Sequence, residues 1–425
     1  MKRLLSLLLC AVLALFCATT AQAAGVSITL TASEYALHYA FDAGAQDPFV
    51  ILEYTTPAEK GWMMLYSADG HFEGDVSLAY SGAGGKTSVA LTSARTTGSI
   101  GKASTTLPKA ADYQKPTGKS NAKVTDFVLT ETPEGFHYAF NAIGTDYMLL
   151  YWRSKEQTVT QPVYPDENGH YEGDVISDLT FARTQFTVQV KSGAGSMKKE
   201  ATVRKGYQAP EAPQRQEGRL SGVTVCIDAG HQENGRFVNE PIGPGLSGST
   251  SGKGGMAQGT KTNRRESIVC LEIGMLLRDE LLRQGANVVM TREDQTTFHT
   301  NIERCEIAEA GGAQIMLRLH CNNSSNRSKR GIQVYGPLNS DYAKAVADAD
   351  TYREMGQKLL DAMKTRVGMT LANSTGMVRL NDNYVGNNWA KMMCFLVEMG
   401  YLSNPAEEYL LVTPVYQQWL AEGMA

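Results

Sequence analysis

A repeat with a fixed offset of 99 residues divides the first half of this chain. Residues 37–41 read LHYAF and residues 136–140 read FHYAF, while residues 69–76 (DGHFEGDV) recur as residues 168–175 (NGHYEGDV). Two blocks separated by the same offset indicate tandem copies of one domain. A chain of 425 residues also exceeds the size of one ordinary hydrophobic core, so several domains are expected.

Each copy is built from short runs of aromatic and β-branched residues in approximate alternation, separated by Gly, Asn, Asp and Pro. Asp69-Gly70 and Asn168-Gly169 are typical of tight hairpin turns. These patterns predict two small all-β sandwiches of immunoglobulin or fibronectin III type. The expected boundaries are a first sandwich at residues 24–103, a linker at 104–123, a second sandwich at 124–206 and a linker at 207–220.

Both copies contain histidines and aromatic residues with two possible roles. The repeated histidines lie in strand patterns or beside turns, without cysteine or a second histidine at ligand spacing, so we expect structural or surface roles rather than metal binding. Trp62 and Trp152 could stack on sugar rings or belong to the sandwich cores. Glycan or cell-wall binding and a spacer role therefore both remain open for the repeats.

The N-terminus predicts export. Lys2-Arg3 precede an apolar run from Leu4 to Cys17, and Ala21-Gln22-Ala23 supplies a small-residue cleavage pattern, so residues 1–23 read as a signal peptide. The run is short for a membrane span, and no later segment reaches about 18 consecutive apolar residues. We expect a secreted protein without stable membrane insertion after cleavage. A net charge of -4 with scattered basic residues argues against nucleic acid as a partner.

Five cysteines follow the predicted signal peptide, all of them within apolar strand or helix patterns. An odd number in such settings favours buried free thiols over a disulfide framework, with one disulfide as the alternative. The five are Cys226, Cys270, Cys305, Cys321 and Cys394.

From residue 221 onward strands alternate with helices. The apolar periodicity predicts helices at residues 264–284, 301–310 and 342–366 and a last helix from about residue 405. Strands are expected at residues 223–229, 287–291, 314–319, 332–335 and 393–397. Such alternation is typical of an α/β domain, with a mostly parallel sheet flanked by helices, and we assign it residues 221–425.

Four candidate functional residues converge on one edge of this predicted sheet. His231 follows the first strand, His320 the third, and Glu398 the strand at residues 393–397, while Glu266 lies in the first turn of the first helix. The carboxyl ends of parallel strands share an edge, where α/β proteins place their ligand sites. Two imidazoles and a carboxylate form the His₂Glu set of catalytic zinc sites.

Two alternatives concern the third ligand. Asn263 stands three residues before Glu266, so the carboxylate could only be closing a helix end as in a capping box. Glu240, in the long Gly-rich segment at residues 232–265, is a rival ligand. We favour Glu266 because a helix start holds a carboxylate more firmly than a Gly-rich loop does.

Several ordered motifs carry a family resemblance. They are IDAGH (residues 227–231), Arg265-Glu266, Thr291-Arg292, Glu303-Arg304, LHCN (residues 319–322) and VEMGYLSN (residues 397–404). Residues 221–425 resemble the zinc-dependent N-acetylmuramoyl-L-alanine amidases of the Amidase_3 family. The resemblance implies Zn²⁺ bound by His231, Glu266 and His320, with Glu398 as the catalytic carboxylate. It also implies peptidoglycan as the substrate, cut between N-acetylmuramic acid and L-alanine.

Three further residues are expected to orient the backbone or the ligands, namely Asp228, Asn322 and Asn404. The segment at residues 232–265 is interpreted as a lid or a substrate-binding rim. Two other functions stay open at this point. One is a zinc peptidase that cuts within the stem peptide, and the other is a catalytically silent wall-binding protein.

Overall fold

The computed structural model places most of the chain in two units, residues 1–117 and residues 118–425, which are described separately. None of the helices in the described ranges combines the length and the apolar character that a membrane crossing requires. The structure describes residues 18–21, 25–34, 36–57, 60–78, 82–111, 122–132, 135–143, 148–153, 158–163, 165–176, 184–192, 197–205, 210–232, 238–250, 255–367 and 377–425.

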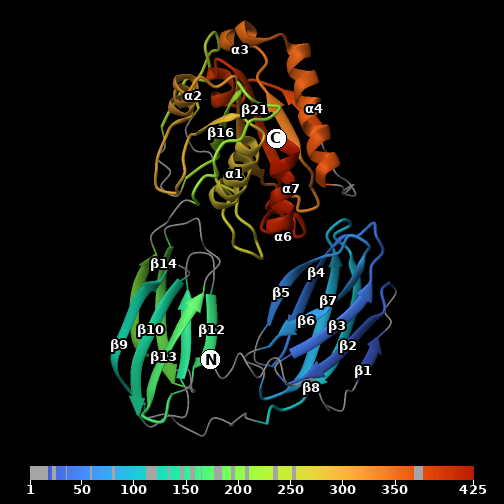
Figure 1. Ribbon diagram of the computed structural model, residues 1–425, viewed down its shortest axis with the longest axis vertical. Coiled ribbons are helices and arrows are strands. Elements are labelled where there is room, and N and C mark those ends of the chain that lie inside the picture. Colours follow the sequence, from blue (N-terminus) through green and yellow to red (C-terminus); the bar gives the residue numbers. More distant parts are fainter. Residues whose placement is uncertain are drawn as a thin grey trace. The chain divides into compact units, whose positions relative to one another are not determined.

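The first unit is a sandwich of two antiparallel sheets (Figure 1). Along the strands, inward residues such as Leu30, Tyr39 and Leu91 are buried and alternate with outward ones, as the period-2 pattern requires. One sheet has the order β1 (Ala18–Ala21), β2 (Ile28–Ser33), β3 (Ala36–Asp42) and β6 (His71–Ser77). The other has the order β5 (Lys60–Tyr66), β4 (Phe49–Thr55), β7 (Gly85–Ser93) and β8 (Ser99–Leu107).

The second repeat has the same plan. Trp152 is only 4% exposed and packs edge-on against Phe136, which makes it a core residue, whereas Trp62 in the first repeat is 37% exposed. One sheet has the order β13 (His170–Ile176), β10 (Gly135–Ile143) and β9 (Lys123–Thr132). The other has the order β12 (Thr158–Val163), β11 (Met148–Arg153), β14 (Thr184–Ser192) and β15 (Met197–Lys205).

The structure differs from expectation at both ends of the first sandwich. β8 continues to Leu107, so the first residues of the predicted linker at 104–123 are strand. The predicted signal peptide lies outside the described residues except for β1, which pairs in antiparallel fashion with β2. Its cleavage therefore remains a prediction.

The C-terminal part is an α/β fold, as predicted. Its six-stranded sheet has the order β17 (Asn287–Met290), β16 (Thr224–Ala229), β18 (Ile315–Asn322), β21 (Met393–Tyr401), β19 (Gln333–Gly336) and β20 (Met377–Leu380). The first four strands are parallel to one another, while β19 and β20 run in the opposite direction. The sheet is thus mostly parallel with a reversed edge.

Helices cover both faces of this sheet (Figure 1). On one face α7 (Pro414–Met424) contacts both α1 (Glu266–Arg283) and α4 (Ala349–Val367). On the other face lie α2 (Asn301–Ala310), α3 (Asp341–Val346) and α5 (Val385–Trp389), and α6 (Glu407–Leu411) precedes α7. Gly274 of α1 faces Ile227, Ala229 and Leu319, so the helix lies close over β16 and β18.

Some expected elements are divided. The helix expected at residues 342–366 is two helices, because Ala347 adopts an extended conformation between α3 and α4. The last helix is also divided, since Pro414 begins α7 as a separate helix after α6. The five cysteines are buried and free, which confirms the thiol prediction and excludes the single-disulfide alternative.

Candidate metal centre and active site

Three parallel strands bring their carboxyl ends to one edge of the sheet. β16 ends at Ala229, two residues before His231. β18 pairs with β16, and β21 pairs with β18, with His320 opposite Glu398. The sequence places His320 and Glu398 just after their strands. In the structure both strands continue past them, to Asn322 and Tyr401, so the two side chains project from regular strand.

The two histidines and Glu266 form a compact cluster. Glu266 Oε1 lies 3.2 Å from His231 Nε2 and 3.1 Å from His320 Nδ1. One potential ligand atom from each residue lies within 4.8 Å of the others. The imidazole ring centres are 4.9 Å apart with their planes at 78°, so the rings converge on the carboxylate instead of stacking. The predicted trio is therefore brought together from three separate elements.

The backbone fixes the Glu266 carboxylate. Oε2 accepts a hydrogen bond of 2.7 Å from the amide of Ala257, and Oε1 accepts one of 3.0 Å from the amide of Cys321. Glu266 is the first residue of α1, and the N-cap residue is Arg265, with no side-chain capping bond. The capping-box alternative with Asn263 is therefore wrong, and the Glu266 carboxylate belongs to the cluster.

Glu240 has a different place. Its buried carboxylate accepts hydrogen bonds from the amides of Asn301 and Ile302 and from the side chain of Asn301, at 2.7–3.2 Å. These groups form the first turn of α2, whose free amides attract a negative charge. The rival ligand of the sequence analysis is thus engaged at a helix start.

The chemistry of the cluster fits a zinc ion. Burial lowers the pKa of His320, which favours the neutral imidazole that binds metals. Burial opposes ionisation of Glu266, but hydrogen bonds from the two histidines hold its pKa well below its usual value. His320 Nε2 and Glu398 Oε2 are buried without a hydrogen-bond partner. The neutral His320 imidazole, the ionised Glu266 carboxylate and these unsatisfied polar atoms suit a His₂Glu zinc site.

Glu398 lies beside the cluster in a protonation state suited to proton transfer. Burial, together with the negative charge of Glu266, raises its pKa to about 8. A carboxyl group with a pKa near the working pH can both take up and release a proton.

A group of tyrosines next to Glu398 was not predicted from the sequence. Tyr335 donates a hydrogen bond of 2.7 Å to Gln333 Oε1, and Gln333 pairs with Glu398 across β19 and β21. The Tyr384 ring lies 5.1 Å from that of Tyr335. Burial raises the pKa of Tyr335, and the charge of Glu398 adds to the shift. The sequence showed only that Tyr335 ends a short predicted strand, and this pattern is too common to indicate a functional site.

A buried ion-pair network fixes the turn that presents His231. Asp228 is fully buried between Arg304 and Arg318, with Arg318 Nε 2.9 Å from Asp228 Oδ2. Thr291 adds a hydrogen bond of 2.7 Å. Burial opposes the charge of Asp228, but the two guanidinium groups hold its pKa far below its usual value.

Arginines also hold the backbone around His231, which has the left-handed φ of +57°. Arg304 donates to the carbonyl of His231 at 3.2 Å. Arg292 donates to the carbonyls of Ala229, Gly230 and Ser267 at 2.7–2.8 Å. A left-handed non-glycine residue costs energy, so it persists only where its surroundings enforce it. The sequence marked these arginines as motif residues but did not reveal what they hold.

The residues expected to orient the site have separate roles. Asp228 anchors the arginines, and Asn322 donates a hydrogen bond of 3.1 Å to Gln333. Asn404 donates to the carbonyl of Arg327 at 2.9 Å and accepts from the amide of Ala406, so it positions a neighbouring loop rather than a ligand. Part of the segment at 232–265 lies outside the described residues, and its role as a lid remains a prediction.

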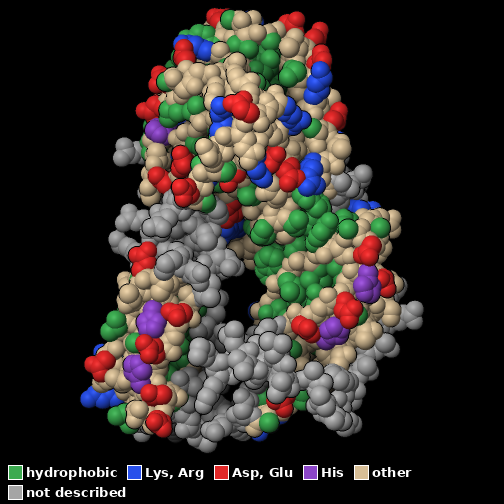
Figure 2. Space-filling view, viewed as in Figure 1, with side chains coloured by type: hydrophobic (Ala, Val, Ile, Leu, Met, Phe, Trp, Pro, Cys, Tyr) green, Lys and Arg blue, Asp and Glu red, His purple; other side chains and the backbone are tan. Residues whose placement is uncertain are grey.

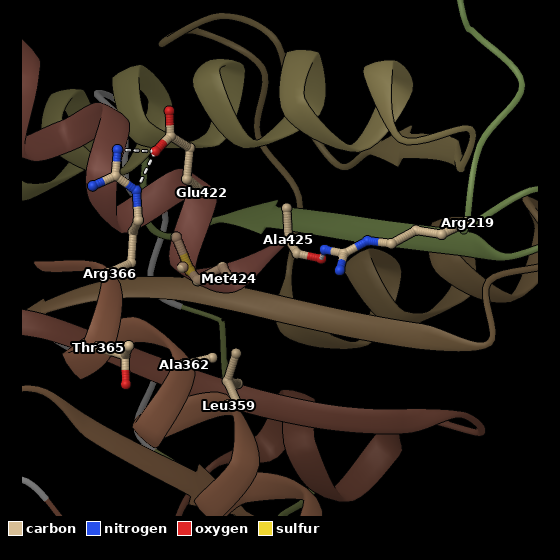
Figure 3. Close-up of a pocket in the computed structure, with 9 residues that line it drawn as sticks. Arg219, Leu359, Ala362, Thr365, Arg366, Glu422, Met424 and Ala425 are labelled. Atoms are coloured by element: carbon tan, nitrogen blue, oxygen red, sulfur yellow. Dashed lines mark hydrogen bonds and ion pairs between the residues drawn. The ribbon is translucent and has the colours of Figure 1, made fainter.

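A cavity of about 570 Å³ lies elsewhere in the domain (Figure 3). Arg219 and residues of α4 and α7 line it, including the pair Arg366 and Glu422. Arg219 also donates to Gln284, just past the end of α1. Since an 18-residue helix is about 27 Å long, this end of α1 is far from Glu266 at its start, and the cavity is separate from the cluster.

Comparisons with known proteins match the same part of the chain. Residues 225–425 fit the family model described as N-acetylmuramoyl-L-alanine amidase (Amidase_3). The chain is 26% identical over 219 residues to the germination-specific N-acetylmuramoyl-L-alanine amidase of Bacillus subtilis strain 168, covering 48% of this chain and 78% of the relative. It is also 26% identical over 214 residues to the probable cell wall amidase LytH of Staphylococcus aureus, covering 49% of this chain and 58% of that protein. A crystal structure of an N-acetylmuramoyl-L-alanine amidase from Clostridium difficile 630 has 24% identity and a TM-score of 0.38, over 48% of this chain and 92% of that one.

Proposed function

Residues 225–425 form a domain of the N-acetylmuramoyl-L-alanine amidase family, and on that premise we propose that this chain is an exported, zinc-dependent cell-wall amidase. Its reaction is hydrolysis of the amide that joins the lactyl group of N-acetylmuramic acid to L-alanine in peptidoglycan. The observation that carries the proposal is the convergence of His231, Glu266 and His320 beside the unsatisfied carboxyl of Glu398.

The donor set assigns the ligand roles. His231, His320 and Glu266 would hold the ion, because one potential ligand atom of each residue lies within 4.8 Å of the others. A zinc ion there would polarise the scissile carbonyl and make water more acidic. The backbone bonds to Glu266 and the arginine contacts around His231 keep these ligands from swinging away.

Glu398 supplies the proton transfers. Its Oε2 atom has no hydrogen-bond partner among the described residues. The positive charge of a bound zinc ion would favour the ionised form of Glu398, which can accept a proton from the attacking water. As the carbon–oxygen bond forms and the carbon–nitrogen bond breaks, Glu398 returns this proton to the nitrogen of L-alanine, which leaves as an amine. An amide nitrogen is a poor leaving group unless it is protonated, so this shuttle is required.

The decisive experiment identifies the new chain ends. Purified peptidoglycan is digested with the zinc-loaded protein, and the new amino termini are labelled and identified. We expect L-alanine from the first stem position. New termini at other residues would mean a peptidase acting within the stem, and wall binding without any released peptide would mean a catalytically silent binding protein.

A further inference from the structure

The two sandwiches carry the same exposed set of charged residues, which we call the acid–histidine face. Figure 2 shows histidines flanked by acidic side chains on each sandwich. In the first repeat the face consists of His38, Ala40 and Asp42 on β3 and His71, Glu73 and Asp75 on β6. In the second it consists of His137, Ala139 and Asn141 on β10 and His170, Glu172 and Asp174 on β13.

Exposed sheet residues are usually free to change, yet five of these six are the same in both copies. Of the six positions of the face, only Asp42 differs from its counterpart, Asn141. The outward positions of the other sheet behave differently. All four on β7 differ from their counterparts on β14, at residues 86, 88, 90 and 92 against 185, 187, 189 and 191. The fold alone does not require the outward side chains of one sheet to persist while those of the other diverge.

The geometry of the face is also the same in both copies. A central glutamate lies between two imidazoles, with Glu73 3.4 Å from His38 Nε2 and 3.7 Å from His71 Nε2. Glu172 lies 3.2 Å from His137 Nε2 and 3.8 Å from His170 Nε2. Each Nδ1 atom lies 2.7–3.1 Å from a second acceptor. The pairs are His38 with Asp75, His71 with Asp42, His137 with Asp174 and His170 with Asn141.

The second copy defines which ring nitrogen carries the proton. Asn141 Nδ2 donates to Asp126 at 2.9 Å, so its carbonyl oxygen faces His170 and accepts from Nδ1. A neutral ring with the proton on Nδ1 presents a lone pair at Nε2, toward the glutamate. The first face holds three carboxylates and the second holds two, so each attracts positively charged donors. Asp42 raises the pKa of His71 and Asp174 raises that of His137, and protonation of these rings reduces the negative charge.

Sugar stacking does not fit this face. Among the large hydrophobic side chains of the described first sandwich, the exposed aromatic ones are Trp62 and Tyr66, and both belong to β5 in the other sheet. We propose that the two faces bind the free primary amines of peptidoglycan stem peptides, an inference that rests on the proposed function for the choice of polymer. An exposed amine–carboxylate pair is weak by itself. Two matching faces in one chain allow bivalent attachment, which multiplies weak contacts.

The test measures sedimentation of the full chain with insoluble peptidoglycan. All proteins carry Glu398→Gln, so that binding is measured without cleavage and a failure of the hydrolysis proposal leaves this result readable. The double charge reversal Glu73→Lys and Glu172→Lys should weaken binding about tenfold. The control Glu53→Lys and Glu200→Lys makes the same change of net charge on the other sheet of each repeat and should bind normally. Unchanged melting temperatures establish that both variants are folded.

Chemical modification of the wall completes the test. Acetylation removes the positive charge of the peptidoglycan amines. The protein with unchanged faces should therefore bind acetylated peptidoglycan weakly. Its affinity should be similar to that of the charge-reversed variant for native peptidoglycan. Equal binding of the charge-reversed and control proteins, or full binding to acetylated wall, would overturn the proposal. Full binding to glycan strands from which the stem peptides have been removed would also overturn it, because it would place the ligand on the sugar.

Discussion

Replacing Glu398 with glutamine separates the catalytic role of this carboxyl from its effect on stability. The amide has nearly the same shape but cannot take up the proton of the attacking water. Loss of a general acid–base group typically costs about 10²–10⁴-fold in rate. We therefore expect turnover to fall by at least that factor while zinc, held by the other three residues, stays bound.

Whereas turnover should fall, the stability of the metal-free protein should rise in Glu398→Gln. The pKa of Glu398 is about 8 in the folded chain against an ordinary value of 4.5. Between these values the folded state keeps a proton that the unfolded state has lost, so stability falls as pH rises. Each pKa unit corresponds to about 1.4 kcal/mol, which gives about 3.4 kcal/mol at pH 7. Since the residue is partly exposed, about 2–3 kcal/mol is a fairer expectation.

The assay is calorimetric unfolding of the chelator-treated chain between pH 4 and pH 8, following the transition of the α/β domain. Glu398→Gln should be the more stable protein at pH 7, and the difference should vanish near pH 4, where both states are protonated. Glu306→Gln, which changes an exposed glutamate on α2, serves as the control and should show no such dependence. A destabilised Glu398→Gln at pH 7, or one with full activity, would refute this account of the site.

Further predictions concern the residues that hold the site. Glu266→Gln should lose bound zinc, measured by elemental analysis, while Glu240→Gln should retain it and lose about 1 kcal/mol of stability, because only the start of α2 is weakened. The opposite pattern of metal content would make Glu240 the ligand. Asp228→Ala leaves Arg304 and Arg318 buried without their counter-charge and should lower the free energy of unfolding by about 3–5 kcal/mol in urea titrations. The stability that ionised Asp228 supplies is present above the unfolded-state pKa of about 3.9 and should be lost as pH falls below it. If the free energy of unfolding of the unchanged protein and that of Asp228→Ala fell equally with pH in this range, the prediction would be contradicted.

Local patterns were sufficient to locate the site but not to describe its support. His231 and His320 could be placed because each follows an apolar run that can only be a buried strand, and the parallel strands then share an edge. The reversal of β19 and β20 could not be read from the sequence, since it depends on pairing with β21 rather than on any feature of their own few residues.

The roles of Glu240 and Asp228 show the same limit. Glu240 stands in a Gly-rich segment, and nothing nearby indicates that it contacts the start of α2, about 60 residues later. Asp228 precedes the predicted ligand, but its partners Arg304 and Arg318 come from two other elements. Pairings between distant polar side chains have no periodicity, so only the folded structure reveals them.

The arginines around Asp228 also bear on how such domains lose activity in evolution. Arg292 and Arg304 hold backbone carbonyls and a buried charge, so a descendant that no longer cut the wall would still need them to fold. His231 and Glu398 have no comparable structural role. Inactive descendants are therefore expected to keep most of the recognisable motifs and to differ at those two positions, which are the ones to inspect before a homologue is credited with catalysis.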